Sequence, residues 1–158
     1  MKKWFVTFLL SIATIFVWAN DHHQIKSFDE LMTYLKQGDK VHVVLHYAKC
    51  KLISDNEIAD DVPDAIGGMT LDVWEYFAPM TIRNEKAFVV SSTSKLIQNP
   101  KGNGYVYNYV KIRFYDDHTV KITAEYLDAN SLEVQMTENF FGKIADGKNN
   151  EGIYLYAD

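Results

Sequence analysis

Apolar and polar residues alternate one by one along most of this chain, a pattern typical of β-strands that bury one face. The alternation is clearest from Tyr105 to Tyr126, in two runs separated by a short polar turn. Both runs are rich in the aromatic and β-branched residues that favour strands. The chain is therefore expected to consist mainly of antiparallel strands.

The two runs also define a hairpin register. A slip of one residue turns a whole strand over, so both apolar rows reach the same core only if paired residue numbers sum to an even value. A three-residue loop, Asp116 to His118, meets this condition. The predicted cross-strand pairs are Phe114 with Val120 and Ile112 with Ile122.

One segment near the N-terminus has the helical period instead. Ser27 is a candidate N-cap, and Glu30 three residues later completes the spacing of a capping box. Gly38 is placed to end the helix. The apolar residues at helical spacing between these signals are Phe28, Leu31, Met32 and Leu35. We expect one short amphipathic helix over residues 27–37.

Further strands are predicted on both sides of the hairpin. The run Val41 to Tyr47 alternates, and residues 69–77 and 88–94 are rich in strand-forming residues. Another strand is expected at 132–136, and a last one at a sheet edge over 153–156. The predicted fold class is α+β and mainly antiparallel β, either a curved sheet or a small barrel, with one N-terminal amphipathic helix.

The first nineteen residues have the three parts of a secretory signal peptide. Lys2 and Lys3 form the positive region, an apolar stretch covers 4–17, and Val17-Trp18-Ala19 is a small-residue cleavage motif. An uncleaved anchor is the alternative, but the apolar stretch is shorter than the roughly 20 residues of a spanning helix. We expect a single mature domain, 20–158, in the periplasm or secreted, with no stable membrane span after cleavage.

The charge balance argues against nucleic acid as a partner. The whole chain has 16 basic and 21 acidic residues, and loss of Lys2 and Lys3 with the signal peptide leaves 14 basic residues and a formal charge of −7. Phosphate backbones are bound by clustered Lys and Arg in excess, the opposite balance.

Cys50 is the one cysteine, so no intrachain disulfide is expected. Three states are open for it: a buried apolar thiol, which is the commonest fate of a free cysteine, an intermolecular disulfide partner, or a nucleophile.

The best candidate for a ligand-binding surface is one face of the strand 105–115. Tyrosine offers a large rigid surface with a polar tip, and both tyrosine and arginine are enriched where proteins recognise partners. The face consists of Tyr105, Tyr107, Tyr109, Lys111, Arg113 and Tyr115. If it is solvated, it could bind a host or envelope protein, or a glycan stacked on the rings. The alternative is that a second layer covers it.

A processed N-terminus could hold a metal ion. Cleavage after Ala19 would expose Asn20-Asp21-His22, whose amine, two backbone amides and imidazole can surround Cu(II) or Ni(II) in a square plane. No other cofactor is expected. His42 and His46 are separated by roughly 13 Å of extended chain, too far to share one ion.

Enzymatic activity is the least favoured prediction. A hydrolase needs a nucleophile, a base and an orienting acid close together. Cys50 with His46, or His118 with Asp116 and Asp117, supply the residue types without a recognised motif around them.

Several short segments together resemble the VirK family of small exported bacterial proteins. They are Tyr47 to Leu52, Ala65 to Gly68, Val106 to Lys111 and Thr119 to Leu127. The resemblance extends from about Ser27 to about Ile144 and implies a virulence-associated or envelope role, with no catalytic residues to transfer. The leading hypothesis is an exported, non-enzymatic binding protein. A periplasmic metal-handling protein is the second and a cryptic hydrolase the third.

Overall fold

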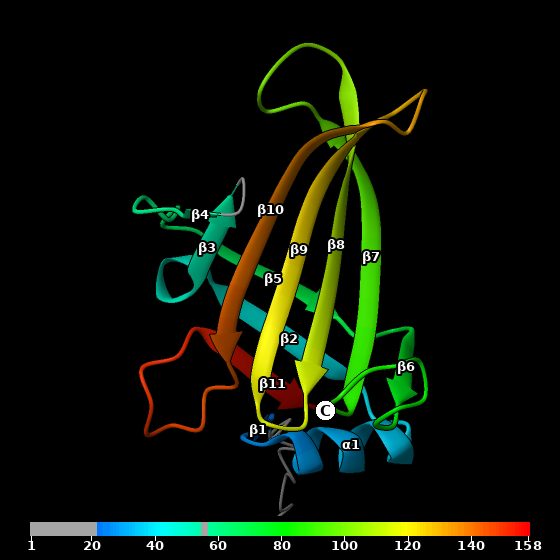
Figure 1. Cartoon of the computed structure of the whole chain (residues 1–158), viewed down its shortest axis with the longest axis vertical. Helices are drawn as coiled ribbons and strands as arrows, with labels where there is room; N and C mark the ends of the chain where they lie inside the picture. Colours follow the sequence, from blue (N-terminus) through cyan, green and yellow to red (C-terminus); the bar gives the residue numbers. More distant parts are fainter. Residues whose placement is uncertain (1–21, 55–56) are drawn as a thin grey trace, which may run out of the picture.

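The computed structural model describes residues 22–54 and 57–158, which form two antiparallel sheets and one α-helix (Figure 1). The smaller sheet has the order β1-β11-β2-β5, and the larger sheet has the order β4-β3-β10-β9-β8-β7-β6. The predicted signal peptide 1–19, with Asn20 and Asp21, lies outside the described residues. The elements are β1 His23–Ile25, α1 Phe28–Gln37, β2 Val41–His46, β3 Lys51–Ser54, β4 Glu57–Ile58, β5 Ile66–Thr70, β6 Trp74–Phe77, β7 Phe88–Gln98, β8 Tyr105–Tyr115, β9 Thr119–Asp128, β10 Val134–Lys143 and β11 Ile153–Ala157.

The mainly antiparallel fold class is confirmed, and the small-barrel alternative is wrong. Within the described residues each sheet is open and ends in edge strands, β4 and β6 in the larger sheet and β1 and β5 in the smaller one. In Figure 1 the long strands β7 to β10 run along the molecule, and the smaller sheet crosses behind their lower part.

The helix α1 follows the predicted capping signals. The Ser27 side chain accepts a hydrogen bond from the Glu30 amide at 3.2 Å, and Gly38 ends the helix with a left-handed φ of 86°. The Glu30 carboxylate accepts from the amide of Lys26, one residue before the amide that a capping box would use. The buried side of the helix is Phe28, Leu31, Met32 and Leu35, as predicted.

The core lies where the two sheets and the helix meet. The smaller sheet contributes alternate residues of β2 and β11, such as Val43 and Leu155, which are at most 1% exposed. The larger sheet contributes Ile112, Phe114 and Ile122, all fully buried. Alternate residues of the long strands therefore point toward the smaller sheet, and the others point to the opposite, outer face.

The predicted register of the β8–β9 hairpin is confirmed. Ile112 pairs with Ile122 and Phe114 pairs with Val120. The connection is the predicted three-residue turn, in which His118 has a φ of 67°. A short polar turn therefore fixes which side chains of both strands enter the core.

The prediction that the C-terminal strand lies at an edge is wrong. β11 is a central strand of the smaller sheet, between β1 and β2, and Ile153, Leu155 and Ala157 are buried. The neighbour that the sequence analysis did not predict is β1. This strand has three residues and is too short to produce a periodic pattern. The expected strand 69–77 is also divided, because β5 belongs to the smaller sheet and β6 to the larger.

Cys50 is a core thiol. Its side chain is 5% exposed and belongs to the main hydrophobic cluster, and its Sγ atom lies 3.7 Å from the backbone carbonyl oxygen of His46. Burial, with a smaller contribution from the negative charge of Glu151, raises the pKa of the Cys50 thiol from 9.0 to about 11. The buried-thiol alternative therefore holds.

We expect the Cys50 thiol to react slowly in the folded protein. With a pKa of about 11, its thiolate fraction at pH 8 is roughly 100-fold below that of the unfolded chain, and burial slows reaction further. The raised pKa contributes to the free energy of unfolding fully below pH 9. This stabilising contribution is lost as the pH rises toward 11. Ellman's reagent, with and without 8 M urea, measures the effect; equal rates in both conditions would contradict it.

Gly152 allows the chain before β11 to pass close to β2. A Cβ atom at this position would lie 2.5 Å from the carbonyl oxygen of His46 and 2.8 Å from the Cβ of Lys49. We expect Gly152→Ala to lower the free energy of unfolding by about 1–3 kcal/mol, because the backbone would have to move. Gly102→Ala is the control, since the nearest atom there is a flexible Asn99 amide nitrogen at 3.3 Å. Urea unfolding measures both; equal midpoints would show that the close approach is not constraining.

Candidate functional site

The predicted ligand-binding face lies on the outer side of the larger sheet, away from the smaller sheet. We call it the outer row: Tyr105, Tyr107, Tyr109, Lys111, Arg113 and Tyr115. Tyr105 is 63% exposed, and the other five residues are half-buried. The alternating residues Val106, Ile112 and Phe114 are buried on the inner side. The smaller sheet and the helix therefore do not form a layer over the outer row.

β8 is a rigid support for the outer row because it is paired on both sides. It pairs with β7 from Tyr105 to Tyr115 and with β9 from Val106 to Phe114. On β7 the facing residues of Tyr109 and Lys111 are Ser94 and Ser92, which are exposed and small. The larger side chains of β8 therefore stand above this side of the sheet.

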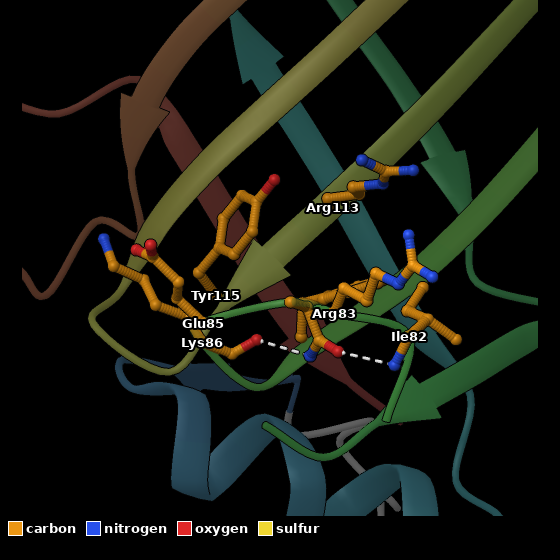
Figure 2. Close-up of a pocket in the computed structure, with 8 residues that line it drawn as sticks. Ile82, Arg83, Glu85, Lys86, Arg113 and Tyr115 are labelled. Carbon is orange, nitrogen blue, oxygen red and sulfur yellow. Dashed lines mark hydrogen bonds between the residues drawn. The ribbon is translucent and has the colours of Figure 1, made fainter. Parts of the chain in front are cut away.

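The lower end of the outer row forms a hollow of about 380 Å³ with the loop between β6 and β7 (Figure 2). Arg113 and Tyr115 line it from β8, and Arg83 lines it from the loop. Figure 2 shows the side chains of Arg83 and Arg113 at this hollow, which Glu85 also lines. Beneath them Phe88, which is 4% exposed, stacks on Phe77 with a centroid distance of 5.0 Å.

Asn84 holds this loop in place. Its side-chain oxygen accepts from the amide of Ile82 at 3.0 Å, and its side-chain nitrogen donates to the carbonyls of Ala78 and Lys86, both at 2.8 Å. Two of these bonds are drawn in Figure 2. Because the bonds join both ends of the loop, Arg83 is supported at a defined position beside β8.

The Lys86 ammonium is neutralised within the protein. It lies 2.6 Å from a carboxylate oxygen of Asp117 in the β8–β9 turn. Partial burial opposes the charged form of Asp117, but hydrogen bonds from Lys86 and Thr119 outweigh burial and lower its pKa to about 2. Arg83 and Arg113, by contrast, form no ion pair with the described residues.

A second hollow lies on the inner side of the larger sheet. A groove of about 610 Å³ runs between β2 and β5 of one sheet and β7 and β8 of the other, and includes Tyr47, Asn108 and Val110. A neighbouring hollow of about 290 Å³ shares these three residues and extends to Tyr126. In Figure 1 the upper parts of the long strands extend past the smaller sheet.

The structure does not test the predicted metal site at His22. Asn20 and Asp21 lie outside the described residues, and the Nδ1 atom of His22 bonds to one carboxylate oxygen of Asp158. The other oxygen of Asp158 bonds to His42 Nε2 at 2.7 Å, and both bonds lower the pKa of the Asp158 carboxyl. Within 22–54 and 57–158, no three His, Cys, Asp or Glu side chains are grouped so that they could hold a metal ion.

The two residue sets of the hydrolase hypothesis are not arranged for catalysis. Cys50 contacts the backbone of His46, whose ring instead packs against Tyr154 at 5.3 Å. In the other set, Asp116 accepts from the amide of Ala87, and Asp117 is bound to Lys86 and Thr119. These aspartates therefore stabilise the turn rather than orient an imidazole.

Sequence reasoning missed two basic residues of this face, Arg83 and Lys121. The position of Arg83 depends on the hydrogen bonds of Asn84, which have no sequence signature. Lys121 had a signal, because the predicted hairpin register already placed it opposite Arg113.

Comparison with known proteins agrees with the fold and the sequence segments. The sequence profile of the VirK protein matches residues 24–132. The crystal structure of lpg1832, a VirK family protein from Legionella pneumophila, is similar with a TM-score of 0.63, covering 84% of this chain and 97% of that chain at 16% sequence identity. No curated protein matches the chain significantly. None of the helices in the described part of the chain is long and apolar enough to cross a membrane. The profile match over most of the chain shows that this protein belongs to the VirK family.

Proposed function

We propose that this protein is an exported, non-enzymatic binding protein of the bacterial envelope or the host interface, and that a protein or glycan ligand docks on the outer row. One observation carries the proposal: six large aromatic and basic side chains stand on the solvent side of a sheet whose other side builds the core. Tyrosine and arginine are enriched where proteins recognise partners, which favours a binding role for this face.

The spacing of the tyrosines suits an extended ligand. Alternate residues of a strand lie roughly 6.6–7 Å apart on one face, so Tyr105, Tyr107 and Tyr109 form a ladder of rings. Aromatic rings with hydroxyl tips provide apolar contact and hydrogen bonds at a low cost in side-chain entropy. Because β8 is paired on both sides, little backbone ordering is needed when a ligand binds.

The remaining parts of the proposal rest on the sequence and on the chemistry of the site. The N-terminal segment has the features of a secretory signal. The thiol of Cys50 is buried and protonated at neutral pH, so it is a poor nucleophile. The metal-handling alternative stays a prediction, because Asn20 and Asp21 lie outside the described residues.

The proposal predicts that binding depends on the outer row and not on the inner groove. We expect Tyr107→Ala with Tyr109→Ala to weaken ligand binding by roughly tenfold or more, as truncation of interface tyrosines commonly does. The matched control is Tyr126→Ala, because Tyr126 is a half-buried tyrosine of the neighbouring strand on the inner face. A glycan array of the mature protein identifies ligands. Calorimetry with these ligands then measures the dissociation constants of the wild type, the double variant and Tyr126→Ala.

The opposite pattern would contradict the proposal. Loss of binding in Tyr126→Ala, with normal binding in the double variant, would place the ligand in the groove between the sheets. Thermal unfolding of all variants separates a loss of binding from a loss of folding.

A further inference from the structure

Two cations face each other across neighbouring strands of the outer face. Arg113 on β8 is directly opposite Lys121 on β9, and Lys111 is the next residue along the same row. Like charges directly opposite each other destabilise a sheet. The chain has more acidic than basic residues. The lysine–carboxylate ion pairs among the described residues are Lys86 with Asp117 and Lys101 with Glu138, and neither involves Arg113 or Lys121. Lys111, Arg113 and Lys121 form no ion pair within the described residues, although Glu125, opposite Tyr109 and diagonal to Lys111, lies on the same face.

A small hollow lies between these cations. It has a volume of about 50 Å³ and is lined by Lys111, Arg113, Lys121 and Thr123, which exceeds the roughly 10–15 Å³ that a single water requires. The Nε atom of Arg113 is buried without a hydrogen-bond partner among the described residues. The Thr123 hydroxyl already donates to Asn139, so the free donors of this hollow belong to the three cations.

Aromatic rings hold two of the cations against the sheet. The Arg113 guanidinium lies 5.2 Å from the ring centroid of Phe88, and the Lys121 ammonium lies 5.5 Å from that of Phe141. Such contacts keep a positive charge close to a surface that it would otherwise leave for water. Phe88 lies on β7 and Phe141 on β10, so the two contacts hold these charged groups on opposite sides of the hollow, and a ligand in the hollow would have to draw them inward.

We propose that Lys111, Arg113 and Lys121 form a binding site for a phosphate group carried by a saccharide. This inference rests on the proposed function and names the ligand chemistry of the outer row. Three cations around one hollow match the charge of about −1.5 to −2 on a phosphate monoester better than the single charge of a carboxylate. An unpaired guanidinium N–H is a donor suited to a phosphate oxygen.

The neighbouring tyrosine favours a saccharide as the carrier. Tyr109 lies on the same face as Lys111 and two residues away, roughly 6.6–7 Å along the strand. This distance allows a sugar ring to stack on Tyr109 while its phosphate lies among the cations. The adjoining hollow (Figure 2) adds Arg83 together with the acid Glu85 at the other end.

The test is an NMR titration of the mature protein at low salt with three probes: inorganic phosphate, glucose 1-phosphate and glucose. We expect phosphate to shift the amide signals around residues 111–113 and 121–123, and glucose 1-phosphate to bind more tightly than phosphate or glucose. Lys121→Gln and Arg113→Lys should weaken glucose 1-phosphate binding by roughly tenfold or more, as loss of charge-assisted hydrogen bonds does. Lys36→Gln on the exposed side of α1 is the charge-matched control and should bind normally.

A second readout separates binding from folding. Lys121→Gln removes both the repulsion with Arg113 and the contact with Phe141, so the readout is the change in unfolding temperature that phosphate causes in each protein. Phosphate should raise the unfolding temperature of the wild type and not that of Lys121→Gln, because a ligand that binds the native state stabilises it. An equal rise in the unfolding temperature of the wild type and of Lys121→Gln on addition of phosphate would overturn the phosphate site.

Three further outcomes overturn the phosphate site. The first is no localised shift with phosphate or glucose 1-phosphate, and the second is equal weakening by Lys36→Gln. The third is binding to phosphatidylglycerol vesicles without binding to glucose 1-phosphate, which would make a lipid surface the ligand. If an uncharged glycan binds, is lost with Tyr107→Ala and Tyr109→Ala and is unaffected by Lys121→Gln, the phosphate site fails and the proposed function stands. If neither set of variants changes binding, both fail.

Discussion

The pairing of β8 with β9 is the constraint on which the rest of the structure depends. Because side chains alternate across a strand, a single register decides the content of both faces of the larger sheet. Ile112 opposite Ile122 places the apolar rows under the smaller sheet, and the same register places Arg113 opposite Lys121 on the outside. The hydrophobic core and the charged outer surface are therefore two consequences of one pairing.

The difference in length between the two sheets produces the other notable features. The smaller sheet and α1 cover one side of the lower part of the larger sheet, where Phe114 and Ile122 are buried. Asn108 and Val110 of β8 also face the inner side of the larger sheet, but they are only half-buried. They line the groove between the two sheets. The outer face has no such cover, and its lower end is instead shaped by the loop that Asn84 holds.

Much of this arrangement follows from local sequence patterns, and the remainder depends on tertiary contacts. The capping signals around Ser27 and Gly38 and the parity of the hairpin were sufficient to predict α1 and the register, because each depends on neighbouring residues alone. β1 was not predictable because three residues carry no period, and without β1 the strand β11 has the pattern expected at an edge. The outer row could be identified from alternation, and its pairing with Lys121 was implicit in the register. The position of Arg83 could not be predicted, because it depends on side-chain hydrogen bonds within a loop.

The pairing of β8 with β9 is measured most directly by the NOE contacts between their backbone protons in the protein of residues 20–158. We expect cross-strand contacts that join residue 112 with 122 and residue 113 with 121. Contacts displaced by one residue, such as 113 with 122, would contradict it, because one of the two strands would then turn its apolar row away from the core and the cations would no longer share one face.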